Sequence, residues 1–315
     1  MNEVTDLEPQ LQYAIVIPEI VRQLVTAKEN SIPYPPLRRE VLQNPTDAIV
    51  NWIDVHDGNG IVVYGEAHHH GEGTLMHEVE LVESVAKKHD LKTVFLEEDE
   101  SQSENLRAYL KTGVMPESLK DYLTRDSLRK DSIGHNYKLQ LVSKCYELGV
   151  EVVFIDDKSK TDRDADWITR VENILGNKVE GVHILIAGRA HAYRMPMQTV
   201  KPHFVGQPEI PGPIKTSVAG LLEKRYAGNV LTVNSLTTEC VENSDSRVKL
   251  VDTGFLQGLA DLGVTEPVAI ETQKSPYGDR LLENSNTLKA GEYDLTLMLP
   301  GRDLSKVHSL IKHKK

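Results

Sequence analysis

Runs of Val, Ile and Leu that alternate with helical segments constrain the fold of this chain more than any other feature. The runs are continuous, without a polar residue at every second position, which is typical of strands covered by helices on both faces. They lie at 61–64, 93–96, 150–157, 182–191, 229–235 and 293–300, and apolar residues recur at helical spacing over 74–89, 137–148 and 164–175. The second helical segment is expected to end at Gly149. The sequence therefore predicts an α/β fold with a central, mostly parallel sheet flanked by helices.

The chain of 315 residues is long enough for one large α/β domain or two smaller ones. We expect residues 61–315 to form an α/β catalytic domain and residues 1–60 to form an N-terminal helical segment that packs on it, with a helix over 11–30. The stretch 200–214 contains four prolines and is predicted to lack regular structure. Residues 236–292 are polar and predict an irregular insertion. Because long loops often cover binding sites, residues 200–214 or residues 236–292 are expected to border the ligand crevice as a lid.

Composition excludes several classes of function. With 47 acidic and 36 basic side chains the net charge is −11, and aromatic residues make up 5 %, so nucleic acid is not an expected partner. Two cysteines without a CxxC pair exclude a disulfide framework and a cysteine-rich zinc site. The sequence shows neither a signal peptide nor a membrane span, which predicts a soluble, cytoplasmic protein and leaves export without a cleaved signal open. No GxSxG, Walker A, HExxH or GxGxxG motif is present.

The first apolar run ends in GEAHHH, a sequence with acid–base or metal-binding capacity. Gly65 permits a sharp exit from the strand, and Glu66 and His68 share a face if the following loop stays extended. A carboxylate beside an imidazole fixes its tautomer and raises its basicity, which suits a general base or a metal ligand. A solvated polar turn is the alternative interpretation. The position between a buried strand and an amphipathic helix favours a functional site.

Two further runs end on similar residue types. In FLEED, Glu97 and Glu98 point to opposite sides of a continuing strand, and we choose Glu97 as the residue that faces the crevice. In AGRAH, Arg189 offers a cation for a carbonyl oxygen, carboxylate or phosphate, and His191 a second acid, base or ligand. Asp156, near the end of VEVVFIDD, is a further candidate for substrate binding, although an Asp there can also cap the next helix.

The carboxyl ends of parallel strands lie at one edge of a sheet, where ligands of open α/β sheets bind. We therefore expect Glu66, His68, Glu97 and His191 to converge in one pocket. The combination of GEAH, FLEE and AGRAH at strand ends resembles the superfamily that unites erythromycin esterases, Tiki and TraB proteins and ChaN-like haem-associated proteins. It is also similar to the Ras-cleaving endopeptidase domains of bacterial toxins. The similarity covers about 61–300 in element order, with the residue matches confined to the three motifs.

This resemblance implies that Glu66, His68, Glu97 or Glu98, and His191 form the active centre. Members of the superfamily include metal-dependent peptidases and metal-independent hydrolases. A divalent cofactor such as Mn²⁺ or Zn²⁺, held by His68, His191 and Glu66, is therefore left open. The chain lacks the membrane anchor expected of Tiki proteins and the lipoprotein signal expected of ChaN, which argues against Wnt processing and haem delivery at an outer membrane.

The sequence as a whole predicts a hydrolase that acts on an ester or amide (peptide) bond. His68 or His191 would remove a proton from water, Glu66 and Glu97 would orient the imidazoles or hold a divalent cation, and Arg189 would stabilise the oxyanion. One alternative is a haem- or metal-binding protein of the ChaN-like type, in which the same histidines hold the group without turnover. Another is a non-catalytic toxin or interaction module.

Overall fold

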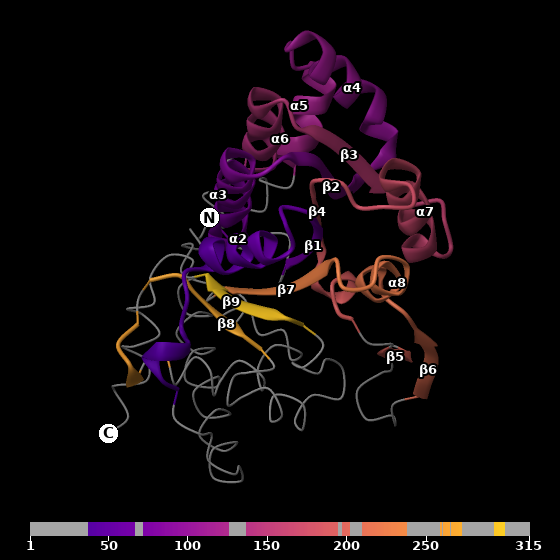
Figure 1. Ribbon diagram of the computed structural model, residues 1–315. Helices are drawn as coiled ribbons and strands as arrows, with labels where there is room; N and C mark the ends of the chain where they lie inside the picture. The colour runs from indigo at the N-terminus through magenta and orange to yellow at the C-terminus, as the bar shows by residue number, and fades with distance from the viewer. Residues whose placement is uncertain are drawn as a thin grey trace, which may run out of the picture.

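The computed structural model describes residues 37–66, 72–125, 137–194, 197–201, 210–237, 259, 261–264, 266–272 and 293–299. Figure 1 shows a central sheet with helices on both sides, so the predicted α/β class is confirmed. The sheet has seven strands in the order β3-β2-β4-β1-β7-β9-β8, and all neighbours are parallel except β8 and β9. Its strands are β1 (Gly60–Glu66), β2 (Leu91–Asp99), β3 (Glu151–Asp156), β4 (Val182–Gly188), β7 (Val230–Thr237), β8 (Val268–Glu271) and β9 (Leu295–Leu299).

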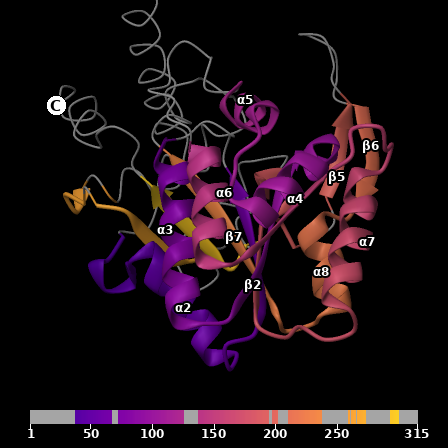
Figure 2. The same ribbon diagram turned by 90° about the horizontal axis from the view of Figure 1, so that it is seen from above.

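The helices form two layers. One layer contains α2 (Pro45–Val55), α3 (Glu72–Lys88), α4 (Ser103–Thr112), α5 (Glu117–Arg125) and α6 (Tyr137–Leu148). The other layer contains α7 (Arg163–Leu175) and α8 (Val218–Arg225). Figure 2 shows α3 and α6 on one side of β2, and α7 and α8 on the other. Short 3-10 turns are η1 (Arg39–Val41), η2 (Glu100–Gln102) and η4 (Arg189–His191). No helix in these described ranges is long and apolar enough to cross a membrane.

The two layers explain why the strand sequences are continuously apolar. In β1, Val62 and Tyr64 belong to the core cluster that includes α3 and α6, whereas Ile61 and Val63 belong to the cluster that includes α7 and α8. Every residue of β1 is buried. Side chains on both faces of this strand are therefore removed from water, and removal of apolar surface from water drives folding.

The predicted helices over 74–89, 137–148 and 164–175 correspond to α3, α6 and α7. Gly149 follows α6 with φ of 70°, as expected after a helix end. Helix α2 lies within residues 1–60, predicted to be a helical segment, but its own bounds were not predicted. Its start carries a local signal: the Asn44 side chain accepts a hydrogen bond from the backbone N of Asp47, and Pro45 is the first helical residue. The predicted helix over 11–30 lies outside the described residues.

Two stretches predicted to be irregular contain strands. Within 200–214 the chain forms part of a two-stranded antiparallel sheet of β5 (Met197–Lys201) and β6 (Ile210–Lys215), so the prediction of no regular structure was wrong there. Each strand of such a ribbon has one edge without a partner strand, and a proline nitrogen is tolerated at that edge. Within 236–292, β8 pairs with β9, and its four-residue run is too short to stand out by periodicity. Most of the rest of that insertion lies outside the described residues.

Candidate functional site

Three of the four residues expected to converge in one pocket lie at the carboxyl edge of the sheet. Glu66 is the last residue of β1, and its Cα is paired with that of Gly188, the last residue of β4. Glu97, near the end of the neighbouring strand β2, accepts a hydrogen bond from the backbone N of Gly188 through Oε2 at 2.6 Å. His191 follows in η4. His68 belongs to residues 67–71, which lie outside the described ranges, so its place at this edge stays a prediction.

Gly65 allows η4 to approach the end of β1. A Cβ atom at Gly65 would lie 2.8 Å from Cβ of Ala192 and 3.2 Å from Cα of Arg189. A real Cβ is not found this close to another heavy atom, so any larger residue at 65 would push η4 away. The Arg189 carbonyl also accepts a hydrogen bond from the Tyr293 hydroxyl at 2.9 Å. Gly65 is therefore needed for close packing of the turn that carries His191.

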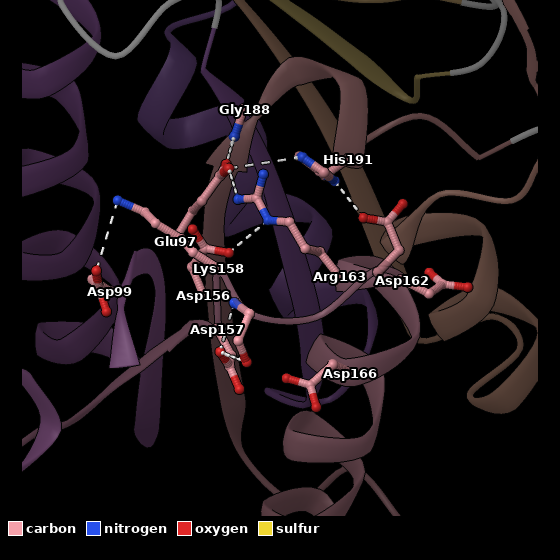
Figure 3. A network of polar contacts seen from close by, with 12 residues as sticks. Glu97, Asp99, Asp156, Asp157, Lys158, Asp162, Arg163, Asp166, Gly188 and His191 are labelled. Atoms are coloured by element: carbon pink, nitrogen blue, oxygen red, sulfur yellow. Dashed lines mark hydrogen bonds and ion pairs between the residues drawn. The ribbon is translucent and has the colours of Figure 1, made fainter. Parts of the chain in front are cut away.

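His191 lies between two carboxylates, and Figure 3 shows it with Glu97 and Arg163. Its Nδ1 is 2.6 Å from Oδ1 of Asp164, a residue in the first turn of α7, and its Nε2 is 3.8 Å from Oε1 of Glu97. Its ring also packs against the buried Trp167, with 4.5 Å between ring centroids. An ionised carboxylate only accepts hydrogen bonds, so Nδ1 must carry the proton. In the neutral imidazole, Nε2 is then the atom that can accept one.

Glu97 is held by donors on both of its oxygens. Besides Gly188 N at Oε2, Arg163 Nη2 donates to Oε1 at 2.8 Å, and the Glu97 side chain is 11 % exposed. Arg163 Nε also donates to Oδ1 of the buried Asp156 at 2.6 Å. Asp156, predicted to bind substrate, thus contacts this group of residues through Arg163. Figure 3 shows Arg163 between the two carboxylates.

Glu98 takes a different direction. Its Oε2 accepts a hydrogen bond from the Tyr122 hydroxyl of α5 at 2.8 Å, on the side of the sheet opposite α7. The structure therefore places Glu97, and not Glu98, beside His191. The role of Glu97 in a site stays a prediction. Neighbouring residues of a strand point to opposite faces, which explains why the two glutamates separate.

Glu66 lies in a second charged group on the α3 and α6 side of the sheet. Its Oε1 is 2.6 Å from Nζ of Lys138, and Oε2 of Glu78 is 3.4 Å from the same nitrogen. The Glu66 and Glu78 side chains are each 1 % exposed. Burial and the charge of Glu66 raise the pKa of Glu78 well above its ordinary value. Burial alone would lower the pKa of Lys138, but the charges of Glu66 and Glu78 raise it.

Sequence reasoning missed Lys138, Glu78, Asp164 and Arg163. Glu78 interrupts the apolar stripe predicted for its helix, between Met76 and Val79, and that placement was a usable signal. The other three lie in the first turns of α6 and α7, without a motif around them.

A divalent cation fits the described carboxylates poorly. Glu66 and Glu97 each contact a cationic side chain of the chain itself, Lys138 at 2.6 Å and Arg163 at 2.8 Å. In the part of the chain that the structure describes, no group of three His, Cys, Asp or Glu side chains is arranged to hold a metal ion. The set predicted from the sequence, His68, His191 and Glu66, includes a residue outside that part and stays a prediction.

No family model matches the sequence, and no curated protein matches it. Several solved structures are similar to this chain. A protein from Bacillus cereus is 10 % identical, with a TM-score of 0.51 over 90 % of this chain and 97 % of its own. A mutant of erythromycin esterase EreC in its open conformation is 12 % identical, with a TM-score of 0.48 over 81 % and 94 %. RRSP, a MARTX toxin effector domain from Vibrio vulnificus, is 17 % identical, with a TM-score of 0.39 over 55 % and 34 %.

At such low identity these likenesses concern the fold alone. An erythromycin esterase and a toxin effector domain are among the structures similar to this chain. The chain spans 34–36 % of the length of the bacterial toxin structures that it matches.

Proposed function

We propose that this protein is a hydrolase of an ester or amide bond in which His191 acts as the general base. The observation that carries the proposal is the 2.6 Å contact between His191 Nδ1 and Asp164 Oδ1, which leaves Nε2 as the proton acceptor. The His191 side chain is 19 % exposed, so it is partly desolvated and still reachable. The choice of an ester or amide bond rests on the resemblance of the three motifs to erythromycin esterases and toxin endopeptidases.

In the proposed reaction, Nε2 of His191 takes a proton from water while the water oxygen attacks the carbonyl carbon of the substrate. Asp164 stabilises the imidazolium that forms, and the Glu97 carboxylate adds negative charge 3.8 Å from Nε2. The imidazolium then returns the proton to the leaving alcohol or amine as the carbon–oxygen or carbon–nitrogen bond breaks. Arg189 stabilises the oxyanion, and His68 with Glu66 completes the site at the end of β1.

Glu97 is a positioning residue in this scheme. Its two oxygens are held by Arg163 and by the backbone of Gly188, so it links α7 to the end of β4 immediately before η4. Its Oε1 lies 3.8 Å from His191 Nε2, a separation too long for a hydrogen bond, so it acts on His191 through its charge.

The test compares wild type with His191→Ala and His68→Ala on libraries of ester and peptide substrates. Each substitution should lower kcat by about 10²- to 10⁴-fold, because each removes a positioned acid or base. His183→Gln is the matched control, since His183 lies at the opposite end of β4. It should keep the wild-type rate. Thermal melting checks that all three variants fold.

An active wild type whose rate survives His191→Ala would contradict the role of His191. Activity that is lost with EDTA and restored by Mn²⁺ or Zn²⁺ would require a metal in the mechanism. Absence of turnover, together with a haem absorption band that disappears in His68→Ala or His191→Ala, would favour the ChaN-like alternative over hydrolysis.

A further inference from the structure

Lys138, the cation beside Glu66, lies at the N-terminal end of a helix, where a positive charge is unfavourable. Lys138 is the second residue of α6, and no acidic residue occupies the first turn of that helix. The N-terminus of a helix carries partial positive charge, so a lysine there is electrostatically unfavourable. Its position must therefore be stabilised by groups outside α6.

Those groups are carboxylates from three other elements. Nζ of Lys138 lies 2.6 Å from Glu66 of β1 and 3.4 Å from Glu78 of α3, and Glu98 of β2 also contributes its charge. The Lys138 side chain is 17 % exposed, whereas Glu66 and Glu78 are almost completely buried. Burying a carboxylate without a partner is strongly unfavourable, and the ammonium group of Lys138 offsets this cost for Glu66.

Of the two contacts of Lys138, the shorter one is with Glu66, which is nearer to His191 in the fold. Glu66 is the last residue of β1, and its backbone is paired with Gly188 immediately before the turn that holds His191. The Glu78 carboxyl, whose pKa burial raises, is the more distant partner. Lys138 therefore acts chiefly on Glu66, and Glu66 lies two positions before His68 in the sequence.

We propose that Lys138 is a positioning residue for the reaction, a built-in cation that fixes the Glu66 carboxylate at the end of β1. This inference rests on the proposed hydrolase function. It assigns to a side chain of α6 the task that a bound divalent ion would perform for Glu66. Lys138 does not contact the substrate and acts through Glu66.

A double-mutant cycle tests this role. Lys138→Met should lower kcat by about 10²-fold with little change in KM, as expected when a catalytic group is displaced by about 1 Å. Lys138→Met combined with Glu66→Gln should be no slower than Glu66→Gln alone, because Lys138 acts through Glu66. Lys144→Met is the matched control: Lys144 is on the same helix and pairs with Glu147 at 2.7 Å, so this variant should keep the wild-type rate.

Lys138→Arg distinguishes a positioning role from simple neutralisation of charge. It also provides a test if Lys138→Met does not fold. Arginine keeps the charge but places its donors differently, so kcat should fall while the melting temperature stays close to that of wild type. A full rate in Lys138→Met or Lys138→Arg, or additive losses in the double variant, would overturn the inference. A wild type that hydrolyses no ester or peptide would instead contradict the proposed function itself.

Discussion

The two ends of strand β4 carry histidines in opposite surroundings. His183, at the amino end, is 4 % exposed, and its Nε2 lies 3.3 Å from the Glu180 carbonyl oxygen. Burial lowers its pKa to about 4. His191, just past the carboxyl end, has carboxylate oxygens 2.6 and 3.8 Å from its two nitrogens. The same residue type is therefore buried beside a backbone carbonyl at one end of β4 and lies between two carboxylates past the other end.

The two edges of the sheet also differ, in the shape of their surface and in their ionisable side chains. At the amino edge a hollow of about 580 Å³ is lined by residues from the starts of β2, β3 and β4 and the end of α7, among them Lys92, Glu151, Lys178 and His183. At the carboxyl edge, Glu66 ends β1, Glu97 lies near the end of β2 and His191 comes after β4. Each of them contacts a side chain of opposite charge or a carboxylate: Lys138, Arg163 and Asp164, respectively. A hollow alone does not mark the chemistry. We place the site at the carboxyl edge because Glu97, His191 and Asp164 lie together there, and ligands of open α/β sheets bind at this edge.

Glycines at the two ends of β1 allow the packing at each edge of the sheet to be disturbed separately. Gly65→Ala should lower the free energy of unfolding by about 3 kcal/mol, because the new Cβ meets the backbone of Val233 and Arg189 and cannot be relieved by one side chain. It should also lower kcat, since η4 carries His191. Urea unfolding and steady-state kinetics measure the two effects.

Gly60→Ala is the control at the other end of β1. Its Cβ would meet the Trp52 ring at 2.5 Å, far from η4. This variant should lose stability but keep the wild-type kcat. An equal loss of kcat in both glycine variants would show that the rate follows general stability and not the packing of η4.

The low pKa of His183 predicts a smaller, pH-dependent effect on stability. In the unfolded chain the imidazole takes up a proton below about pH 6.5, whereas folded His183 stays neutral down to about pH 4. The unfolded state therefore binds more protons in this window, and stability falls as the pH decreases from 6.5 to 4. The loss due to His183 should reach about 2 kcal/mol at pH 5.

Urea unfolding of wild type and His183→Gln at pH 7 and pH 5 isolates this contribution. His77 has a pKa lowered to about 4 by burial and remains in both proteins, so its effect cancels in the difference. The drop in stability between the two pH values should be smaller in His183→Gln by about 2 kcal/mol. An identical drop in both proteins would contradict the buried, neutral state of His183.

The fold was largely readable from the sequence because strands and helices follow local patterns. The apolar runs located β1, β2, β3, β4, β7 and β9, and strand ends then placed Glu66, Glu97 and His191 at one edge. The partners of these residues were not readable. Asp164 is 27 positions from His191, and Lys138 is 72 from Glu66, so their contacts depend on how α7 and α6 pack. Alternation along β2 separated Glu97 from Glu98 but could not show which side faces α7.

The tautomer of His191 decides whether its Nε2 can accept a proton from water. Nitrogen-15 NMR of the imidazole, assigned by comparison with His191→Ala and recorded where the ring is neutral, reports which nitrogen carries the proton. We expect the proton on Nδ1 and a bare Nε2 in wild type, because Asp164 accepts from Nδ1 at 2.6 Å. Asp164→Ala should shift the population toward the Nε2–H form. A proton on Nε2 in wild type, or a tautomer unaffected by Asp164→Ala, would contradict His191 as a base oriented by Asp164.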